Sequence, residues 1–237
     1  MYRTVLAFPL LPGKSDADAS RIADRFRQQP AEYAQSRDRL GVTLERAYLQ
    51  HTPMGNLVVA YQESDGDFAA VTKALLDSDL PLDRFFIEAL QELHGVDLTQ
   101  PAGPPPQTIG AWTDPAVTTR GRGMAFVAPL LPGKTEAGKA FVADAYHRED
   151  MTRSRRHLGE SLEVVTVIST PQGDLAAVYV EGVDPFDSNA RFAASDDPFD
   201  VWFRGELATL FPPEVDFGKP VPGVTEIFDS AQLRAEA

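Results

Sequence analysis

The 237-residue chain contains no cysteine. This excludes disulfide bonds, thiolate metal sites, iron–sulfur clusters and a cysteine nucleophile. Histidine is scarce as well, with four residues, so few nitrogen ligands are available for a metal ion. We expect no metal site and no tightly bound cofactor. Apolar runs long enough to span a membrane are also missing, and the start of the sequence lacks the apolar core and cleavage site of a signal peptide. We therefore expect a soluble, cytoplasmic protein.

Basic residues are outnumbered, because 22 Lys and Arg face 35 Asp and Glu, for a formal net charge of −13. A surface that binds nucleic acid needs clustered Lys and Arg, and no stretch of this chain concentrates them. Anionic membrane surfaces are disfavoured for the same reason. The chain is otherwise typical of a globular protein, with 43% hydrophobic and 24% charged residues. We expect a small-molecule ligand or substrate, and neither nucleic acid nor membrane as a partner.

An internal repeat is the most informative feature of the sequence. The hexapeptide PLLPGK occupies residues 9–14 and recurs at residues 129–134. Further matches follow in the same order at offsets of 118 and then 117 residues, over some 90 positions. They include Ser36-Arg37 with Ser154-Arg155, Leu44-Glu45 with Leu162-Glu163, Tyr61 with Tyr179, Glu63 with Glu181, Ser78 with Ser195, and Asp83 with Asp200. A repeat of this length is a domain, so the chain contains two copies of one unit.

Each copy has the pattern strand, helix, strand, strand, helix, strand. Ser15 followed by Asp18 predicts a helix start, Pro30 predicts a break, and Leu40-Gly41 predicts the helix end. The predicted strands of the first copy are 4–8, 42–50, 56–63 and 108–112, around helical stretches 68–76 and 82–93. In the second copy the strands are 125–128, 162–169, 174–181 and 224–228, with a helix from Thr135 to Leu158 and a helical stretch 186–210 interrupted at Pro198. The middle strands of each copy form a hairpin.

This order, βαββαβ, predicts the ferredoxin-like α+β arrangement, in which both helices cover one face of an antiparallel sheet. Strands such as 57–61 and 164–168 are apolar on both faces, so the second face of each sheet also needs a cover. Two tandem ferredoxin-like domains packed sheet to sheet satisfy this need. We place the boundary near residue 116, between a Pro-rich segment at 101–106 and a Gly-Arg-rich stretch at 118–123, giving domains 1–116 and 117–237.

The repeat and its PLLPGK, Thr-Pro-x-Gly and Ser-Asp-x-Pro-x-Asp elements resemble the dimeric α+β-barrel superfamily, in a tandem-fused, uncharacterised bacterial form. The resemblance implies an intramolecular barrel, and hence a monomeric chain equivalent to a dimer. It also implies a ligand held between sheet and helices. The superfamily includes cofactor-independent monooxygenases, cyclases, isomerases, haem-binding enzymes and non-catalytic sensors, so fold alone does not choose among them.

Three histidines occupy places that the repeat leaves unmatched, and two of these are candidate catalytic residues. His51 lies in the predicted hairpin turn and corresponds to Ser169, while His94 precedes Gly95 at a helix end. Either could transfer protons, although a capping or surface role fits both positions. In haem-binding relatives a histidine ligand lies in the second helix, and the comparable region here has Phe85-Phe86 and Trp202-Phe203.

Strand residues supply the remaining candidates. Tyr61, the third catalytic candidate, could offer a phenol with Tyr48, but its repetition as Tyr179 favours packing between sheets. Arg46 lies in the middle of a strand covered on both faces, so it must line a cavity or find a partner, and cross-strand Glu63 is the structural candidate. Trp202 completes the candidate substrate-binding set with Arg46 and Tyr48, although a core role also fits it.

The leading hypothesis is a cofactor-independent enzyme of monooxygenase, cyclase or isomerase type that acts on a small apolar or aromatic metabolite in a cavity of the first half. The alternatives are a non-catalytic small-molecule-binding or sensing protein, a haem-binding protein, and a partner-binding pseudo-dimer with a fully packed interior.

Overall fold

The computed structural model describes residues 1–100 and 103–235, so Pro101 and Ala102 of the Pro-rich segment lie outside the described part. The first copy of the repeat comprises β1 (Tyr2–Pro9), α1 (Asp16–Gln28), α2 (Pro30–Leu40), β2 (Val42–Thr52), β3 (Gly55–Ser64), α3 (Phe68–Leu76), α4 (Pro81–His94) and β4 (Gln107–Thr113). The second comprises β5 (Arg122–Pro129), α5 (Thr135–Ala145), α6 (Glu149–Leu158), β6 (Glu160–Thr170), β7 (Gly173–Gly182), α7 (Pro185–Ala194), α8 (Pro198–Leu207), β8 (Val224–Asp229) and α9 (Ser230–Ala235).

Local signals set the ends of α1 and α2 as the sequence predicts, whereas the single helix predicted from Thr135 to Leu158 is two helices, α5 and α6. Ser15 caps α1 and forms a capping box with Asp18, so the first free N–H groups of that helix are satisfied. Pro30 cannot lie inside a helix but fits the first turn of one, so α1 ends before it and α2 begins at it. Gly41 ends α2 at φ 68°, a left-handed conformation that is costly for residues with a Cβ, and Gly159 ends α6 in the same way.

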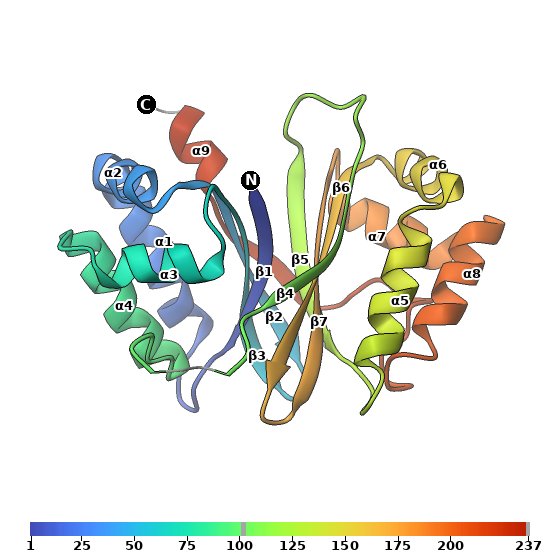
Figure 1. Ribbon diagram of the computed structural model, residues 1–237, viewed down its shortest axis with the longest axis horizontal. Coiled ribbons are helices and arrows are strands. Elements are labelled where there is room, and N and C mark those ends of the chain that lie inside the picture. The colour runs from blue at the N-terminus through green and yellow to red at the C-terminus, as the bar shows by residue number, and fades with distance from the viewer. Residues whose placement is uncertain (101–102, 236–237) are drawn as a thin grey trace.

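The strands form two antiparallel four-stranded sheets that pack face to face at the centre, with helices covering the outer face of each (Figure 1). The first sheet has the order β1-β3-β2-β8 and the second β4-β6-β7-β5. Hairpins β2–β3 and β6–β7 pair antiparallel, which confirms the predicted hairpins. Among the described residues, no helix is both long and apolar enough to cross a membrane.

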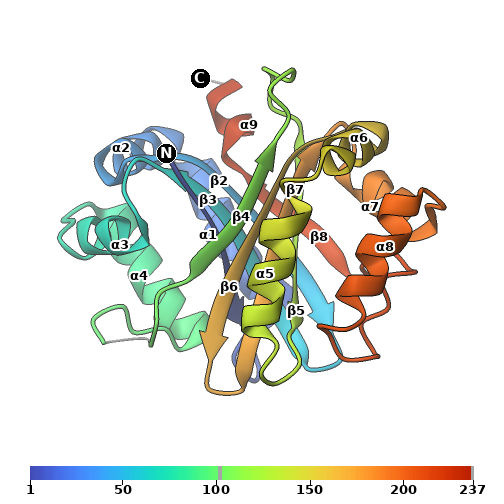
Figure 2. The ribbon, with the colours of Figure 1, turned by 45° about the vertical axis from the view of Figure 1, so that its right-hand side comes forward.

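The last strand of each copy lies in the sheet of the other copy. After α8 the chain crosses to the first sheet, where β8 pairs with β2, and β4 of the first copy pairs with β6 (Figure 2). The backbone N–H of His51 donates to the Gly223 carbonyl at 2.9 Å and fixes the crossing segment. The domain boundary near residue 116 stays a prediction. Each sheet contains one strand from the other side of that boundary, β8 in the first sheet and β4 in the second.

The facing sheets share one apolar core. Val5, Val59, Val164 and Ala177 are fully buried in it, with residues from both copies in contact. At its centre the rings of Tyr61 and Tyr179 stack with centroids 3.6 Å apart and planes 2° from parallel. The repeated tyrosine is therefore a packing residue between the sheets. Fully burying an apolar side chain such as Val5 or Val59 stabilises a fold by about 1.5–3 kcal/mol.

Candidate functional site

A cavity of about 830 Å³ lies between the outer face of the second sheet and the helices that cover it. Its walls come from β5, β6 and β7, from α5, α7 and α8, and from the segment that leads from α8 to β8. We expected a cavity in the first half; the structure places this one over the second sheet, and the first half supplies part of its rim through the β2–β3 turn. The wall therefore comes mainly from the second copy of the repeat, whereas both copies contribute to the rim.

Two positions of the repeat differ in a way that opens space in the second half. Phe8 of β1 is replaced by Ala128, which lines the cavity. In the first half the Phe8 ring packs against His94, with centroids 5.5 Å apart. In the second half Phe211 stands at the position of His94, and it too lines the cavity. The sheet of the second half thus carries the methyl group of Ala128 where the first half has the Phe8 ring. The space that Phe8 and His94 fill in the first half is part of the cavity in the second half.

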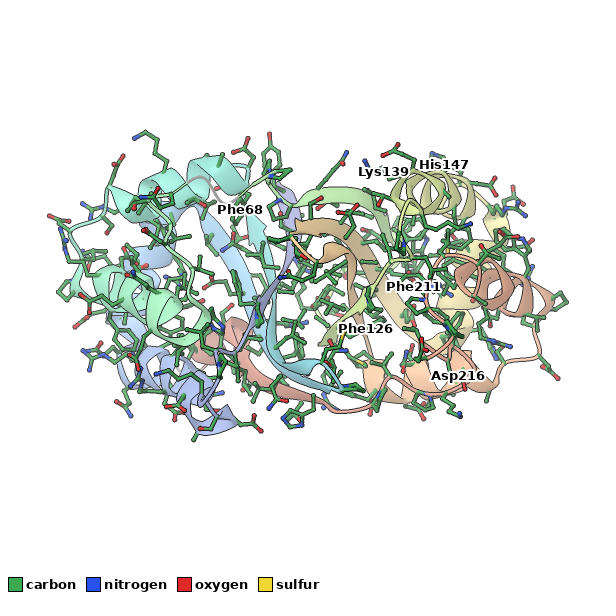
Figure 3. The ribbon with its side chains drawn as sticks, turned by 90° about the horizontal axis from the view of Figure 1, so that it is seen from below. Phe68, Phe126, Lys139, His147, Phe211 and Asp216 are labelled. Atoms are coloured by element: carbon green, nitrogen blue, oxygen red, sulfur yellow. The ribbon has the colours of Figure 1, made fainter. Side chains whose placement is uncertain are left out.

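The cavity is predominantly apolar and closed at one end. Figure 3 views the molecule from the end where the hairpin turns lie, with Phe126 and Phe211 inside the half built on the second sheet and Asp216 nearer its edge. Lining residues at this end are exposed, Met54 to 78%. At the opposite end the lining residues Arg155 and Glu160 are buried. The cavity thus opens beside the hairpin turns and ends at a buried group of charged side chains.

That buried group extends a polar network that occurs in both halves, which we call the repeated network. The first half contributes Ser36, Arg37, Glu45, Ser78 and Asp83, and the second Ser154, Arg155, Glu163, Ser195 and Asp200. In each half the arginine Nε donates to the glutamate, at 2.5 Å in the first and 2.6 Å in the second. Its repetition in both halves indicates a structural role, since a buried arginine is stable only when paired.

The second half adds an acid that the first half lacks. Glu160, the first residue of β6, stands where β2 has Val42. Val42 packs against Val71, whereas Glu160 Oε1 accepts a hydrogen bond from Ser188, the residue that corresponds to Val71. An apolar pair has become a carboxyl–hydroxyl pair at the cavity wall. This replacement is the clearest chemical difference between the two halves.

The surroundings of Glu160 favour its protonated form. Burial raises the pKa of Glu160 to about 7, and the neighbouring Glu163 raises it too, while Arg155, with Nε 3.3 Å from Glu160 Oε2, lowers it. Glu160 Oε2 accepts no hydrogen bond in the described structure. Beside it, Tyr146 donates from Oη to Glu163 Oε1 at 2.7 Å, and burial raises the pKa of Tyr146 well above its ordinary value. A carboxyl group with a pKa near neutrality can both accept and donate a proton at the closed end of an apolar cavity.

Of the predicted site residues, His51 lines the cavity, at its rim. Its ring Nε2 lies 2.9 Å from Asp16 Oδ2, and both side chains are about half exposed. The same carboxylate accepts a hydrogen bond from Asn56 at 3.1 Å. His51 therefore links the hairpin turn to the start of α1 and is placed at the entrance rather than beside the buried acid.

Arg46 lies between the sheets, away from the cavity. It does not pair with Glu63 as the cross-strand pattern predicts. Its side chain crosses to the facing sheet, where it lies 3.1 Å from Glu181 and 2.5 Å from the Tyr179 hydroxyl, and its Nε lies 3.0 Å from Asp229 of β8. The prediction considered one sheet, and the partners belong to the other sheet and to the exchanged strand.

Glu63 is instead the partner of two other arginines, Arg3 and Arg120. The hydroxyl of Tyr61 also donates to Glu63, at 2.6 Å. Tyr48 is fully buried in the same inter-sheet core. The structure brings Arg46, Tyr48 and Tyr61 together there, and none of the three lines the cavity.

His94 and Trp202 also lie outside the cavity lining. His94 Nδ1 is 3.0 Å from the Pro9 carbonyl, and burial lowers the pKa of this imidazole. Trp202 packs among Phe141, Phe199 and Phe203 at the helices, with the Arg148 guanidinium 4.1 Å above its ring. Both residues therefore fix helices in place.

The donor set does not fit a haem in this cavity. The histidine that lines it is His51, which is at the rim and engaged with Asp16. His94 is turned to the Pro9 carbonyl. Within residues 1–100 and 103–235 no group of three or more His, Asp or Glu side chains could hold a metal ion.

Sequence reasoning did not select Glu160, Tyr146 or Arg155 as site residues. Arg155 and Glu163 were visible as repeated positions, but repetition alone does not show that one copy borders a cavity. A signal for Glu160 was present in the alignment of the two copies, because an acid replaces an apolar strand residue there while the flanking Gly and Leu positions match.

No protein-family model and no curated protein matches this chain. Among solved structures, it is similar to a candidate monooxygenase from Fusobacterium nucleatum, with a TM-score of 0.50 and 11% identity over 95% of this chain and 91% of that one. A candidate monooxygenase from Lactobacillus acidophilus matches with a TM-score of 0.48 and 13% identity, over 97% and 95% of the two chains. An anthrone oxidase-like protein also matches, with a TM-score of 0.48 and 10% identity over 94% and 88%.

The chain has the fold of a tandem α+β barrel, with two four-stranded sheets packed face to face. The Fusobacterium structure spans nearly its whole length, so the similarity covers both copies and not one ferredoxin-like unit alone. At this level of identity the similarity establishes the fold, and the chemistry has to be argued from the tandem barrel's own residues.

Proposed function

We propose that this protein is a cofactor-independent enzyme that removes a proton from a small apolar molecule bound in the second-half cavity, with Glu160 as the base. The observation that carries the proposal is the position of Glu160: a buried carboxyl at the closed end of an apolar cavity, in place of the valine of the other copy. Enzymes commonly place their acid–base groups in such settings.

Each neighbour has a role in this proposal. The hydroxyl of Ser188 donates to Glu160 Oε1, and Oε2, which lies 3.3 Å from Arg155 Nε and accepts no hydrogen bond in the described structure, is the oxygen that we assign to the substrate proton. Arg155 stabilises the ionised carboxylate and is itself held between the rings of Phe192 and Phe203, at 5.1 and 4.8 Å. At a pKa of about 7, close to half of the Glu160 population is ionised near neutral pH and available as a base.

The reaction type that we favour is monooxygenation, because the structural neighbour with the same fold is named as a candidate monooxygenase. Glu160 takes a proton from an acidic C–H bond, and the electron pair of that bond remains on the substrate as an enolate. Dioxygen accepts these electrons and becomes bound to carbon. The overall balance is a CH₂ group plus O₂ giving a C=O group plus water, without an external reductant.

The test is deuterium exchange into apolar carbon acids such as anthrone and 2-tetralone. The exchange reaction is run without oxygen and is measured by mass spectrometry. The wild-type protein should accelerate exchange well above the buffer rate, and Glu160→Gln should lose roughly a hundredfold or more of that acceleration. Glu214→Gln is the matched control, because Glu214 also lines the cavity but is exposed at its rim. Oxygen uptake measured next separates monooxygenation from cyclisation or isomerisation.

Exchange at the buffer rate, or equal exchange by wild type and Glu160→Gln, would contradict the proposal. Tight binding of these molecules without exchange would favour the alternative of a non-catalytic binding protein.

A further inference from the structure

We propose that the cavity selects apolar molecules whose polar end donates a hydrogen bond, as alcohols, phenols and amines do, and rejects carboxylates such as fatty acids. This inference rests on the proposed function, since it concerns the same cavity and the same oxygen of Glu160. A ligand O–H or N–H group that binds Glu160 Oε2 occupies the proposed base, so such ligands compete with the carbon-acid substrate.

The charges at the closed end of the cavity disfavour an anionic ligand. In the described lining this end holds two carboxylates, Glu160 and Glu163, against one cation, Arg155, while Glu214, Asp216 and Lys219 are exposed at the rim. Lys219 is 78% exposed at the rim and paired with Asp216 at 2.8 Å. Of these two cations, Arg155 is therefore the one that could attract a ligand carboxylate at the closed end.

Arg155 is already surrounded by acids. Its Nε lies 2.6 Å from Glu163 and 3.3 Å from Glu160, and its Nη1 lies 3.8 Å from Asp200. A ligand carboxylate would be a fourth anion around one guanidinium in a buried setting, where like charges repel strongly. Fatty-acid-like ligands should thus be disfavoured although the wall suits their chains.

The closed end also holds a hydrogen-bond acceptor that no donor in the described part of the protein uses. Glu160 Oε1 is taken by Ser188, and both oxygens of Glu163 are taken, by Tyr146 and Arg155. Glu160 Oε2 is buried and lies 3.3 Å from Arg155 Nε, but it accepts no hydrogen bond in the described structure, so an O–H or N–H group of a ligand would supply the missing donor. A hydrogen bond to a charged acceptor contributes about 1.5–3 kcal/mol, which corresponds to roughly tenfold or more in affinity.

The experiment compares four fluorescent probes that share one apolar body: naphthalene, 2-naphthol, 2-naphthylamine and 2-naphthoate. Dissociation constants are measured by fluorescence titration with the full-length protein at about pH 8, where Glu160 is mostly ionised. The naphthol and the amine should bind roughly tenfold or more tightly than naphthalene, and the carboxylate should bind more weakly than naphthalene. The two donor probes separate a hydroxyl preference from an amine preference.

Glu160→Gln should lose the discrimination, because its amide carries no charge and can donate to a carboxylate as well as accept. Glu214→Gln removes the same charge from the rim and should keep the wild-type order. Should Glu160→Gln fail to fold, the wild-type protein still tests the inference: lowering the pH below the Glu160 pKa should narrow the gap between naphthoate and naphthalene.

Binding of 2-naphthoate as tightly as 2-naphthol by the wild-type protein would overturn the inference, and so would an identical probe order in Glu160→Gln. The two proposals fail separately. The expected order of probe affinities without deuterium exchange would refute the proposed function alone. Glu160-dependent exchange together with equal affinities for all four probes would refute the proposed ligand preference alone.

Discussion

At the scale of single residues, the two copies of the repeat act as internal controls for each other. Val42 and Glu160 occupy equivalent positions on β2 and β6, and Val71 and Ser188 face them from α3 and α7. The same backbone therefore carries an apolar pair in one half and a polar pair in the other. The pattern of the repeat could predict the shared network, but burial and its effect on the Glu160 pKa depend on packing that the sequence does not show.

The raised pKa of Glu160 makes stability depend on pH. The folded protein holds the proton up to a pKa of about 7, while the unfolded chain releases it near the ordinary glutamate pKa of 4.5. The folded state thus binds more protons between these values, and the free energy of unfolding falls as the pH rises through that window. From about pH 4.5 to pH 8, wild type should lose about 3 kcal/mol relative to Glu160→Gln.

Urea unfolding of both proteins at several pH values measures this difference. If the free energies of unfolding of wild type and Glu160→Gln change in parallel with pH across this window, the Glu160 carboxyl has an ordinary pKa.

Gly123 permits the close approach of the two sheets. A Cβ at this position would lie 2.3 Å from the Tyr48 hydroxyl and 2.7 Å from the Tyr179 ring. Gly123→Ala should therefore lower the free energy of unfolding by about 1–3 kcal/mol. Gly205 in α8 has nothing within 4 Å of such a Cβ, so Gly205→Ala should raise it by up to about 1 kcal/mol. Thermal unfolding of the two variants checks both signs, and an unaffected Gly123→Ala would mean that the sheets are less tightly packed than described.

At the scale of secondary-structure elements, the sequence predicts the order and nature of the strands and helices because their caps, breaks and apolar patterns are local. It does not predict the exchange of β4 and β8. Each last strand could pair within its own copy or with the other copy, and a repeat with the same element order in both halves does not distinguish the two. In the folded chain the segment before β8 is held to β2 by the hydrogen bond from the His51 N–H to the Gly223 carbonyl, a contact that no local pattern of the sequence indicates.

The exchange predicts the behaviour of a separated half. Residues 1–116 alone would keep β4 but lose β8, so the edge of β2 and the inter-sheet face would both be uncovered. We expect this fragment to be unfolded or to form a dimer in which two copies exchange β4. Size-exclusion chromatography with light scattering, together with circular dichroism, measures this, and a folded, stable monomer of residues 1–116 would be the contrary result.

At the scale of the whole molecule, duplication allows one half to differ from the other. The first half fills the space beneath its helices with the cluster of Phe26, Tyr33, Leu82 and Phe228, while the second half encloses the cavity and the acid. The first half still contributes the β2–β3 turn to the rim. Sequence patterns could not place the cavity, because it depends on the sizes of side chains such as Phe8 and Ala128 that meet only in the folded chain.

We infer that the Glu160 carboxyl titrates near neutral pH at the wall of a ligand cavity. A pH titration of the glutamate carboxyl ¹³C resonances by NMR, in the presence and absence of 2-naphthol, tests this inference. One resonance should titrate near pH 7, disappear in Glu160→Gln and shift when 2-naphthol binds. Titration of every glutamate within the ordinary range, about 3–5.5, with no resonance responding to the ligand, would contradict it.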